Sequence, residues 1–434
     1  MGARTQAEGF YGWWLLFFLL IVYTIPIGFA FYSPMMLYPF MTEETGWARG
    51  EVMVGFTAVL LLMGLGAPLV AWMISHFGAR VTIFIGGLII AVAAFLMGLM
   101  GHIYPIYLIL SVLVGLGIAL ASVVPVQTVV VSWFSARRAL ALGLVMGGGA
   151  IGGFLVPQII SRVVLSAGGN WRVGWFMIAA ASVVGAIMAI FTVRNRPEDM
   201  GQCQDGLSSD EIKVVAGGKS RAVRTYRTPV SWTVRDALRT PALWFLIVAL
   251  IGGHFLWHVV LTQAPFHLQD RGFDPATAAF LYSLAVGLSI VGRFAIAGLG
   301  DIIEPHSLFA FGTLCILAGG ILFWFVSPEA MWIAYLYPLL AGFGFGAIYI
   351  CEAAIIGNYW GHEAFPGIRG VIGPIGVTFE AIAAPLAGFI YDIQGTYLTV
   401  MLIAWAGAAI GFVAMLFCRP PEPKEKLDMT ASSA

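Results

Sequence analysis

Charged side chains inside apolar segments are the chemically most informative residues of this sequence. Arg293 lies within the apolar stretch 275–300, and Glu380 lies within the stretch 366–391. A charge held at the middle of a bilayer costs about 2.5–3.5 kcal/mol on insertion scales, so a residue of this kind needs a structural or functional reason. Arginine keeps its proton in proteins, and its planar guanidinium matches a carboxylate through two parallel hydrogen bonds. Arg293 therefore predicts a binding site for a carboxylate that comes and goes.

A structural role for Arg293 is the alternative, because a buried glutamate could hold it permanently. The candidates are Glu380 and Glu352, of which Glu352 lies in the stretch 331–358. Glu380 could also carry a proton, because a carboxyl group in an apolar environment can lose its charge by protonation. Glu352 lies nearer the end of its stretch, where it could instead pack between helices or extend toward the membrane surface. Both glutamates are candidates for proton coupling.

Two histidines one helical turn apart extend this set. His254 and His258 lie in the apolar stretch 241–268, and residues spaced by four share one face of a helix. Histidine changes its charge near neutral pH, so such a pair can relay protons. Each histidine could equally hydrogen-bond a neighbouring helix. A membrane-embedded enzyme or a sensor is the alternative from another class, but the sequence offers no obvious third metal ligand for the pair.

The composition indicates that these residues lie in a membrane. Of the 434 residues, 60% are hydrophobic and only 10% are charged, whereas a soluble domain has roughly a quarter of its residues charged. The apolar runs are long enough for helices that cross the hydrocarbon core, and the alternation typical of barrel strands is absent. A net charge of zero gives no reason to expect a nucleic-acid partner. We therefore predict an all-α integral membrane protein that is embedded in a lipid bilayer.

Twelve apolar runs divide the chain into two sets of six. They predict an N-terminal six-helix bundle over 1–193, a cytoplasmic linker over 194–239, a C-terminal six-helix bundle over 240–418 and a cytoplasmic tail over 419–434. The linker is rich in charge, Ser and Gly and is typical of a flexible tether, with a weak amphipathic pattern at 207–216. The runs are 12–36, 50–74, 81–101, 104–131, 138–165, 172–193, 241–268, 275–300, 306–326, 331–358, 366–391 and 396–418.

Basic residues orient these spans. With both termini in the cytoplasm, 17 of the 22 Lys and Arg residues fall in inner loops and termini, Arg369 among them. The outer loops hold only Arg49, Arg162, Arg172 and Arg271. Cytoplasmic loops of membrane proteins carry an excess of Lys and Arg, so this asymmetry supports the assumed orientation. Arg137 and Arg138 then lie at the inner surface, where we expect them not to touch substrate.

The two halves resemble copies of one another. When the second half is shifted by 227 residues, four glycines and one tryptophan of the first half fall on residues of the same type. The pairs are Gly115 with Gly342, Gly117 with Gly344, Trp133 with Trp360, Gly143 with Gly370 and Gly149 with Gly376. Two parallel repeats with a substrate site near the membrane midplane are typical of transporters that work by alternating access. At the same offset Arg293 and Glu380 correspond to glycines, so these buried charges belong to the C-terminal copy alone.

Two motifs resemble the signatures of the monocarboxylate transporters, which belong to the major facilitator superfamily. One is the acidic, Gly and aromatic pattern that opens the first span, in which Phe10 replaces a small residue. The other is an aromatic pair and two arginines that lead into a Gly-rich fifth span. The motifs read Glu8-Gly9-Phe10-Tyr11-Gly12-Trp13 and Trp133-Phe134-Ser135-Ala136-Arg137-Arg138, the second followed by Gly143, Gly148 and Gly152. The bacterial oxalate–formate antiporters belong to the same wider group, and the resemblance covers nearly the whole chain.

The resemblance implies roles for particular residues. In this family an arginine of the eighth span is expected to grip the carboxylate, and Arg293 occupies that place. In the oxalate branch, aromatic residues such as Phe345 and Tyr349, which are one turn apart here, line the site. Polar groups in the first and fourth spans of this fold usually face the central cavity, which adds Tyr32 and Gln127.

The chain also departs from the family where proton coupling is concerned. It has no Lys in any span, and Ser289 stands where the animal carriers place an Asp. We expect a carrier of small carboxylates, proton-coupled, that acts by alternating access as a monomer without a cofactor in the plasma membrane of a bacterium. The alternatives are an organic-anion antiporter of the oxalate–formate type and a carrier of neutral or cationic solutes.

Overall fold

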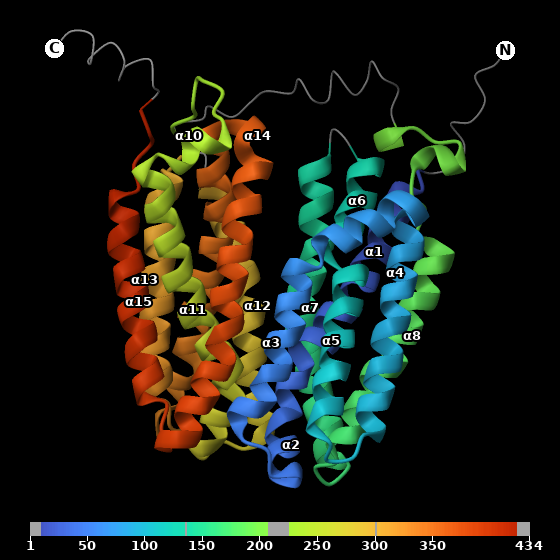
Figure 1. Cartoon of the computed structure of the whole chain (residues 1–434), viewed down its shortest axis with the longest axis vertical. Coiled ribbons are helices and arrows are strands. Elements are labelled where there is room, and N and C mark those ends of the chain that lie inside the picture. The colour runs from blue at the N-terminus through green and yellow to red at the C-terminus, as the bar shows by residue number, and fades with distance from the viewer. Residues whose placement is uncertain (1–9, 135–136, 207–224, 300–301, 423–434) are drawn as a thin grey trace. The chain divides into compact units, whose positions relative to one another are not determined.

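The computed structural model describes residues 10–134, 137–206, 225–299 and 302–422, and every regular element within these ranges is a helix. The chain forms two compact units (Figure 1). The N-terminal unit comprises the described residues of 1–46 and 58–220, and the C-terminal unit comprises those of 47–57 and 221–434. Each unit is a bundle of long apolar helices, as the sequence predicts.

The helices of the N-terminal unit follow the predicted spans. Prolines interrupt the first span after α1, because proline lacks the backbone N–H that a helix interior needs, and the span continues through the short turns η1 and η2. The first turns of α3 belong to the C-terminal unit. The elements are α1 (Gly12–Ile25), η1 (Pro26–Tyr32), η2 (Ser33–Met36), α2 (Tyr38–Thr45), α3 (Arg49–Leu65), α4 (Ala67–Leu99), α5 (Tyr104–Ala121), α6 (Val123–Trp133), α7 (Arg138–Ser166), α8 (Trp171–Thr192), η3 (Pro197–Met200) and η4 (Gln204–Gly206).

The C-terminal unit adds one short helix and five long ones. The longest, α14, contains both the tenth and the eleventh predicted span, and the chain reverses between them at Gly361. The φ of Gly361 is 77°, a left-handed backbone conformation that glycine adopts at low cost. The elements are α10 (Val234–Leu238), α11 (Pro241–Asp270), α12 (Pro275–Leu299), α13 (Pro305–Trp324), η5 (Pro328–Ala330), α14 (Met331–Gln394) and α15 (Leu398–Phe417).

Eleven helices in the described chain are long and apolar enough to cross a membrane. The predicted second span is absent from that set because it is divided at Gly66 between α3 and the start of α4. The helix α4 in turn contains a sharp turn at Gly78, whose φ is 79°, so α4 holds both the end of the second span and the third span. Each of the twelve predicted spans is therefore built of helix.

Glycines related by the offset of 227 occupy equivalent positions in the two units. A Cβ atom on Gly115 of α5 would press against the backbone of Val59 in α3, and a Cβ atom on Gly342 of α14 would press against the backbone of Ala285 in α12. In each unit, therefore, the fourth span approaches the second span of the same repeat at a glycine. This agreement is what two copies of one six-helix unit should show.

The two signature motifs pack against one another in the N-terminal unit. The ring centroid of Phe10 lies 5.9 Å from that of Trp133 and 5.6 Å from that of Phe134. Tyr11 lies 5.8 Å from Trp133 in the same way. The start of the first motif, residues 8 and 9, lies outside the described residues. The motifs thus help to join the first span to the end of the fourth.

The described ends of the predicted linker are each attached to their own unit. Gln204 donates a hydrogen bond to the carbonyl of Ser132 in the N-terminal unit, at 3.0 Å. In the C-terminal unit the backbone N–H of Thr228 donates to the carbonyl of Asn358, at 2.8 Å, and α10 packs against α14. The interfacial helix predicted at 207–216 lies outside the described residues.

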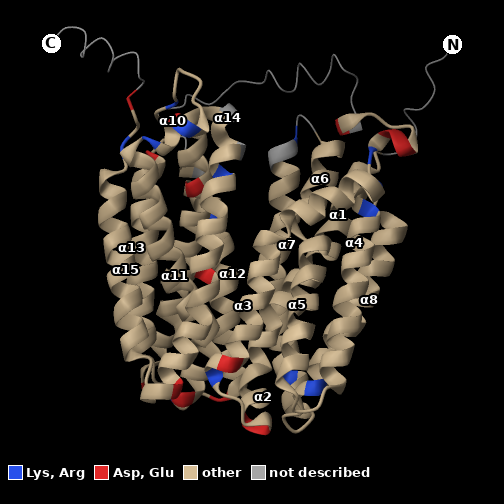
Figure 2. Cartoon of the chain, in the orientation of Figure 1, with Lys and Arg blue, Asp and Glu red and all other residues tan. Residues whose placement is uncertain are grey.

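Charged residues gather at the helix ends of both units (Figure 2). Between the ends the ribbon is almost free of Lys, Arg, Asp and Glu, as the cost of charge in a bilayer requires. The intramembrane charges that the sequence singled out, Arg293, Glu352 and Glu380, all belong to the C-terminal unit. These charged candidate residues are therefore concentrated in one of the two units.

Candidate functional site

Close packing of α12 against α14 positions Arg293. A Cβ atom on Gly292 would press against the carbonyl group of Phe343, and one on Gly346 would press against the carbonyl group of Ser289. The two helices therefore approach at glycines on either side, and this brings the guanidinium of Arg293 over the ring of Tyr349, with 4.6 Å between Cζ and the ring centroid. A cation over an aromatic face is attracted by the ring by about 0.5–2 kcal/mol.

No described carboxylate lies within ion-pair distance of Arg293. Its Nε atom is buried and has no hydrogen-bond partner among the described residues. A buried donor without a partner costs about 1–3 kcal/mol, more when the group is charged. The residue as a whole is nevertheless only half-buried. The sequence predicted three charged residues for the site, Arg293, Glu352 and Glu380. Of these, Arg293 alone forms no ion pair within the described chain.

Glu380 of α14 joins the two predicted histidines of α11. Its Oε1 contacts Nδ1 of His254 at hydrogen-bonding distance, and its Oε2 lies 3.8 Å from Nε2 of His258. All three side chains are largely buried, with exposed fractions of 10% for His254, 7% for His258 and 15% for Glu380. The structure thus supplies a third group beside the histidines that the sequence alone did not reveal. Among the described residues no group of three or more such side chains is arranged to hold a metal ion.

Glu352 has a different partner. It forms an ion pair with Arg369, and both residues belong to α14, on opposite sides of the reversal at Gly361. The side chain of Glu352 is 8% exposed and that of Arg369 is 39% exposed. The alternative in which Arg293 pairs with Glu352 or Glu380 is therefore not what the structure shows, because each glutamate is engaged elsewhere.

Aromatic rings connect Arg293 to the histidine pair. Phe345 stacks face to face on Trp257, with 4.4 Å between centroids and an angle of 5°. The same ring lies 5.7 Å from the imidazole of His254 and 6.4 Å from that of His258. Tyr349 lies 6.2 Å from Phe345, which completes the connection.

Two members of this constellation escaped the sequence analysis. Trp257 lies three residues after His254, so its presence on the same face of α11 could have been read from helical spacing. Arg369 was counted with the inner loops, although it lies inside α14 and holds Glu352. Arg369 lies three residues into the eleventh predicted span, and this position could have indicated that it belongs to the helix.

Tyr32 and Gln127 belong to the N-terminal unit. Tyr32 ends η1, and its ring lies 5.0 Å from that of Phe31. Gln127 lies in α6 and its Nε2 lies 3.6 Å from the sulfur of Met146, as a weak hydrogen bond. Both side chains are half-buried. Their predicted contact with substrate stays a prediction.

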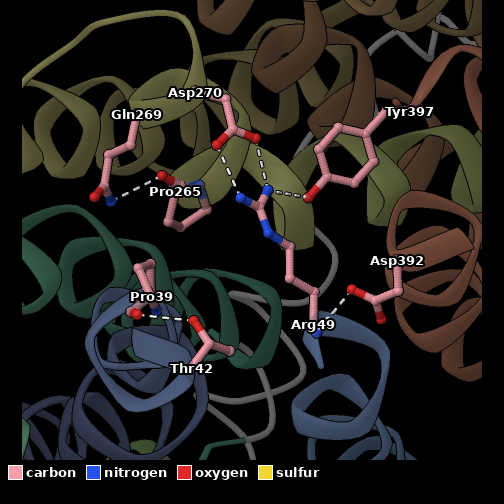
Figure 3. A network of polar contacts seen from close by, with 8 residues as sticks. All are labelled: Pro39, Thr42, Arg49, Pro265, Gln269, Asp270, Asp392 and Tyr397. Atoms are coloured by element: carbon pink, nitrogen blue, oxygen red, sulfur yellow. Dashed lines mark hydrogen bonds and ion pairs between the residues drawn. The ribbon is translucent and has the colours of Figure 1, made fainter. Parts of the chain in front are cut away.

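A second arginine of the C-terminal unit has a fully formed set of partners (Figure 3). Arg49, at the start of α3, donates to both carboxylate oxygens of Asp270, at 2.6 and 2.8 Å, and to the hydroxyl of Tyr397, at 2.9 Å. Its Cζ atom lies 3.9 Å from the ring centroid of Tyr391 and 4.7 Å from that of Phe266. The sequence places Arg49 in an outer loop and gives no sign of these contacts.

Asp392 holds the backbone at the same place. Its carboxylate accepts hydrogen bonds from the backbone N–H groups of Arg49, at 3.1 Å, and Gly50, at 2.7 Å. The first N–H groups of a helix lack partners within the helix, and a carboxylate there is stabilising. A Cβ atom on Gly50 would also collide with Phe389. The first turn of α3 is thus attached to the C-terminal unit through its side chain, its amides and its packing.

Comparison with known proteins places the chain in a family. The sequence profile of the Major Facilitator Superfamily matches residues 18–376, which is most of the chain. The chain therefore belongs to the Major Facilitator Superfamily, whose members are transporters.

Relatives and solved structures agree with this assignment. The chain is 26% identical over 347 residues to Monocarboxylate transporter 13 of Bos taurus, covering 79% of this chain and 74% of the relative. It is 24% identical over 409 residues to the Probable sulfoacetate transporter SauU of Cupriavidus necator, covering 88% of each. The predicted resemblance to monocarboxylate transporters is confirmed by these matches.

The fold matches solved transporters as well. A crystal structure of a bacterial homologue of the human lysosomal transporter Spinster, inward-facing and unoccupied, superposes with a TM-score of 0.73 at 15% identity, over 96% of this chain and all of that one. The nucleoside transporter NupG gives a TM-score of 0.67 at 12% identity, over 93% of this chain and 99% of that one. The predicted major facilitator fold is confirmed.

Proposed function

We propose that this transporter carries small carboxylates and that Arg293 is the residue that holds them. The observation that carries the proposal is the contrast among the intramembrane charges of the C-terminal unit. Glu380 contacts His254, and Glu352 pairs with Arg369, whereas Arg293 has a buried, unpartnered Nε and no carboxylate beside it. An anion that binds and leaves would supply what this arginine lacks, and a carboxylate fits a guanidinium in two parallel hydrogen bonds.

The aromatic neighbours of Arg293 give such a site its shape. The guanidinium of Arg293 lies over the ring of Tyr349, and Phe345 contacts both Tyr349 and His254. Apolar walls with few polar groups are typical of sites for small molecules. In the proposal Tyr32 and Gln127 contribute polar contacts from the N-terminal unit, and the substrate is passed across the membrane by alternating access of the two units.

The relatives narrow the class of substrate. Their names refer to monocarboxylates and to sulfoacetate, which also carries a carboxylate group. We favour proton-coupled movement of the anion, because three titratable groups, His254, His258 and Glu380, form a cluster beside Phe345. Exchange of one organic anion for another is the alternative mode of the same site. The proposed location is the plasma membrane, in the inner membrane of a bacterium, with the protein acting as a monomer.

Reconstitution into proteoliposomes tests the proposal directly. Uptake of labelled formate, acetate, L-lactate, pyruvate, oxalate and sulfoacetate is measured with and without a pH gradient, and the methyl esters of the four monocarboxylates are tested as competitors. We expect uptake of at least one acid and no competition from its neutral ester, because the ester cannot accept two charge-assisted hydrogen bonds. Equal competition by acid and ester, or uptake of neutral and cationic solutes only, would contradict the role of Arg293.

A further inference from the structure

We infer that the transported proton binds between Nε2 of His258 and Oε2 of Glu380, and that it enters when an anion occupies Arg293. The second half of this inference rests on the proposed function, whereas the first half concerns the protein alone. The two atoms lie 3.8 Å apart, which is too long for a hydrogen bond and short enough to become one with a small movement. The place is a gap with a basic nitrogen on one side and a carboxylate oxygen on the other.

Hydrogen-bond partners fix where the other protons are. Nδ1 of His258 lies 2.9 Å from the backbone carbonyl oxygen of His254, and a carbonyl oxygen can only accept, so this nitrogen carries a hydrogen. In the neutral imidazole the other nitrogen, Nε2, then presents a lone pair toward Glu380. On the other side, Nδ1 of His254 contacts Oε1 of Glu380, and this contact needs one hydrogen between nitrogen and oxygen.

One vacant proton position is therefore favoured over the others. With the two hydrogens above in place, the cluster of His254, His258 and Glu380 carries one negative charge. The next proton could bind Nε2 of His254, but that atom is buried and has no acceptor among the described residues. A proton between His258 and Glu380 would have a partner on both sides, and the cluster would become neutral. The geometry thus selects a single position.

The charges around the cluster explain why an anion should bring this proton in. Two arginines, Arg293 and Arg369, and two glutamates, Glu352 and Glu380, balance when both histidines are neutral. A bound carboxylate adds one negative charge to this partly buried set, and one proton restores the balance. Uncompensated charge is costly in an apolar environment, so binding of the anion favours binding of the proton.

The helices packed around the cluster offer few other titratable side chains that could take the proton instead. From α14, Phe345 contacts both histidines, and the charges of Glu352 and Arg369 act on His254. From α12, Arg293 lies over Tyr349. The helix α15 contains no titratable side chain, and α13 contributes only His306 in its first turn and Cys315. Ring contacts through Phe345 and Tyr349 link the cluster to Arg293, and no hydrogen bond or ion pair joins them in the described chain, so the proposed coupling acts through charge.

Nitrogen NMR of the full-length protein in lipid nanodiscs tests the proton position without any substrate. Histidine is labelled with ¹⁵N, and the His258 signals are assigned by their absence in His258→Gln. We expect His258 to carry hydrogen on Nδ1 at high pH and to gain a second hydrogen, on Nε2, as the sample is acidified to about pH 5. In Glu380→Gln this gain should be altered or lost, because the carboxylate oxygen that faces Nε2 is gone.

Three results would overturn the assignment. His258 could carry its hydrogen on Nε2 at high pH, it could remain neutral down to pH 5, or it could titrate identically in Glu380→Gln. His76→Gln is the matched control, because His76 is an exposed histidine of α4 in the other unit and its loss should leave the His258 signals in place. His258→Asn provides a second assignment variant if His258→Gln fails to fold.

A second measurement separates the coupling from the proposed function. Sodium acetate, sodium L-lactate and sodium sulfoacetate are added to purified protein in weakly buffered solution that contains a pH indicator, and anion binding is measured by calorimetry. We expect up to one proton to be taken up per bound anion, with a reduction of at least severalfold in His258→Gln. Anion binding without proton uptake would overturn the coupling and leave the carboxylate site intact. Absence of binding by all three anions, with the NMR titration as expected, would count against the proposed substrate class alone.

Discussion

Arg49 and Arg293 both belong to the C-terminal unit, and both lie against aromatic rings, yet their polar surroundings are opposite. Arg49 has a bidentate pair with Asp270, a hydrogen bond to Tyr397 and an aspartate on its own backbone. Arg293 has the face of Tyr349 and a buried Nε without a partner. The two arginines differ in how many of their N–H donors the protein itself satisfies. This difference indicates the role of each arginine better than its position in the sequence does.

The reason for the difference lies in which residues the neighbouring helices present. Arg49 meets the last turns of α11 and α14, which carry Asp270 and Asp392, and Tyr397, which precedes α15. Asp270 is exposed, so water can share the cost of charge there. Arg293 meets the first half of α14, which presents Phe345 and Tyr349. A permanent carboxylate beside Arg293 would compete with any anionic ligand, so its absence is consistent with binding and release.

The largest expected effect comes from Arg293→Lys. Lysine keeps the charge and loses the planar fork, so the affinity for the carboxylate should fall by about 10- to 100-fold, the equivalent of about 1.5–3 kcal/mol for hydrogen bonds to a charged group. Calorimetry on the purified protein measures this change. Arg49→Lys is the matched control, and it should leave the affinity unchanged. Equal affinity in wild type and Arg293→Lys would remove Arg293 from the site.

Substitution of Arg49 should destabilise the purified protein more than substitution of Arg293, the opposite of the ranking expected for carboxylate affinity. Arg49→Gln removes the ion pair with the exposed Asp270 carboxylate and the hydrogen bond to the buried Tyr397 hydroxyl, which should lower the free energy of unfolding by about 0.5–1.5 kcal/mol. Arg293→Gln should cost less, because no described carboxylate loses a partner. Thermal unfolding in detergent compares the two variants. A larger loss in Arg293→Gln would mean that Arg293 is the structural arginine of the pair.

The aromatic contacts allow a finer comparison. Tyr349→Leu removes the only ring that stacks on the guanidinium of Arg293 in the described chain, so the affinity for the carboxylate should fall by about 2- to 30-fold, which corresponds to about 0.5–2 kcal/mol. Tyr349→Phe keeps the ring and should preserve most of the affinity. Tyr391 lies beside Arg49, which Asp270 still holds when the ring is removed. Tyr391→Leu should therefore change both the affinity and the stability by less than Tyr349→Leu changes the affinity. Binding and unfolding measurements on the three variants check this order.

A further expected effect concerns stability alone, at a carboxylate that forms no ion pair among the described residues. Asp274 precedes α12, and its oxygens accept from the hydroxyl and N–H of Thr277 and from the N–H of Ala276, which lowers the pKa of this carboxyl below its ordinary value. Asp274→Ala should cost about 0.5–2 kcal/mol, the usual value for such a cap.

The pH dependence of that contribution has a definite sign. Because the pKa of Asp274 is lower in the folded state, its stabilisation is present above the unfolded value of about 3.9 and is lost as the pH falls through the folded value. The difference in unfolding temperature between wild type and Asp274→Ala should therefore shrink as the pH is lowered below about 4. A difference that grows on acidification would contradict the capping role.

Much of the fold could be predicted from the sequence because it depends on periodic, local properties. Apolar runs and charge-poor composition are sufficient to define the spans, and the constant offset of 227 revealed the repeat. The predicted Arg293 and the His254–His258 pair could be found in the same way, since a charge within an apolar run is visible without a structure. The position of Glu380 in its span was visible as well.

The pairing of these groups could not be predicted, because it depends on how helices rotate about their axes. Glu380 and His254 are 126 residues apart, and the sequence equally allowed Glu380 to face Arg293. Arg369 was counted with an inner loop although it lies three residues into the predicted span 366–391, because a basic residue so near the end of a span is expected at the membrane surface. Arg49 was hidden for a further reason: its partners Asp270, Asp392 and Tyr397 are all near span ends, where charged residues are expected and carry no signal.

The attachment of α3 to Asp392 has a consequence for the order in which this chain can be completed during synthesis. Arg49 and Asp392 are separated by 343 residues, so the first amides of α3 leave the ribosome long before their acceptor is made. At about 5–20 residues per second the delay is on the order of 20–70 s. During that interval the N-terminal six spans can insert and pack, whereas the outer end of α3 must wait, with its guanidinium and its amides held by water or lipid headgroups. Its final position is therefore one of the last features of the molecule to form, and the translation of α14 sets the time at which it does.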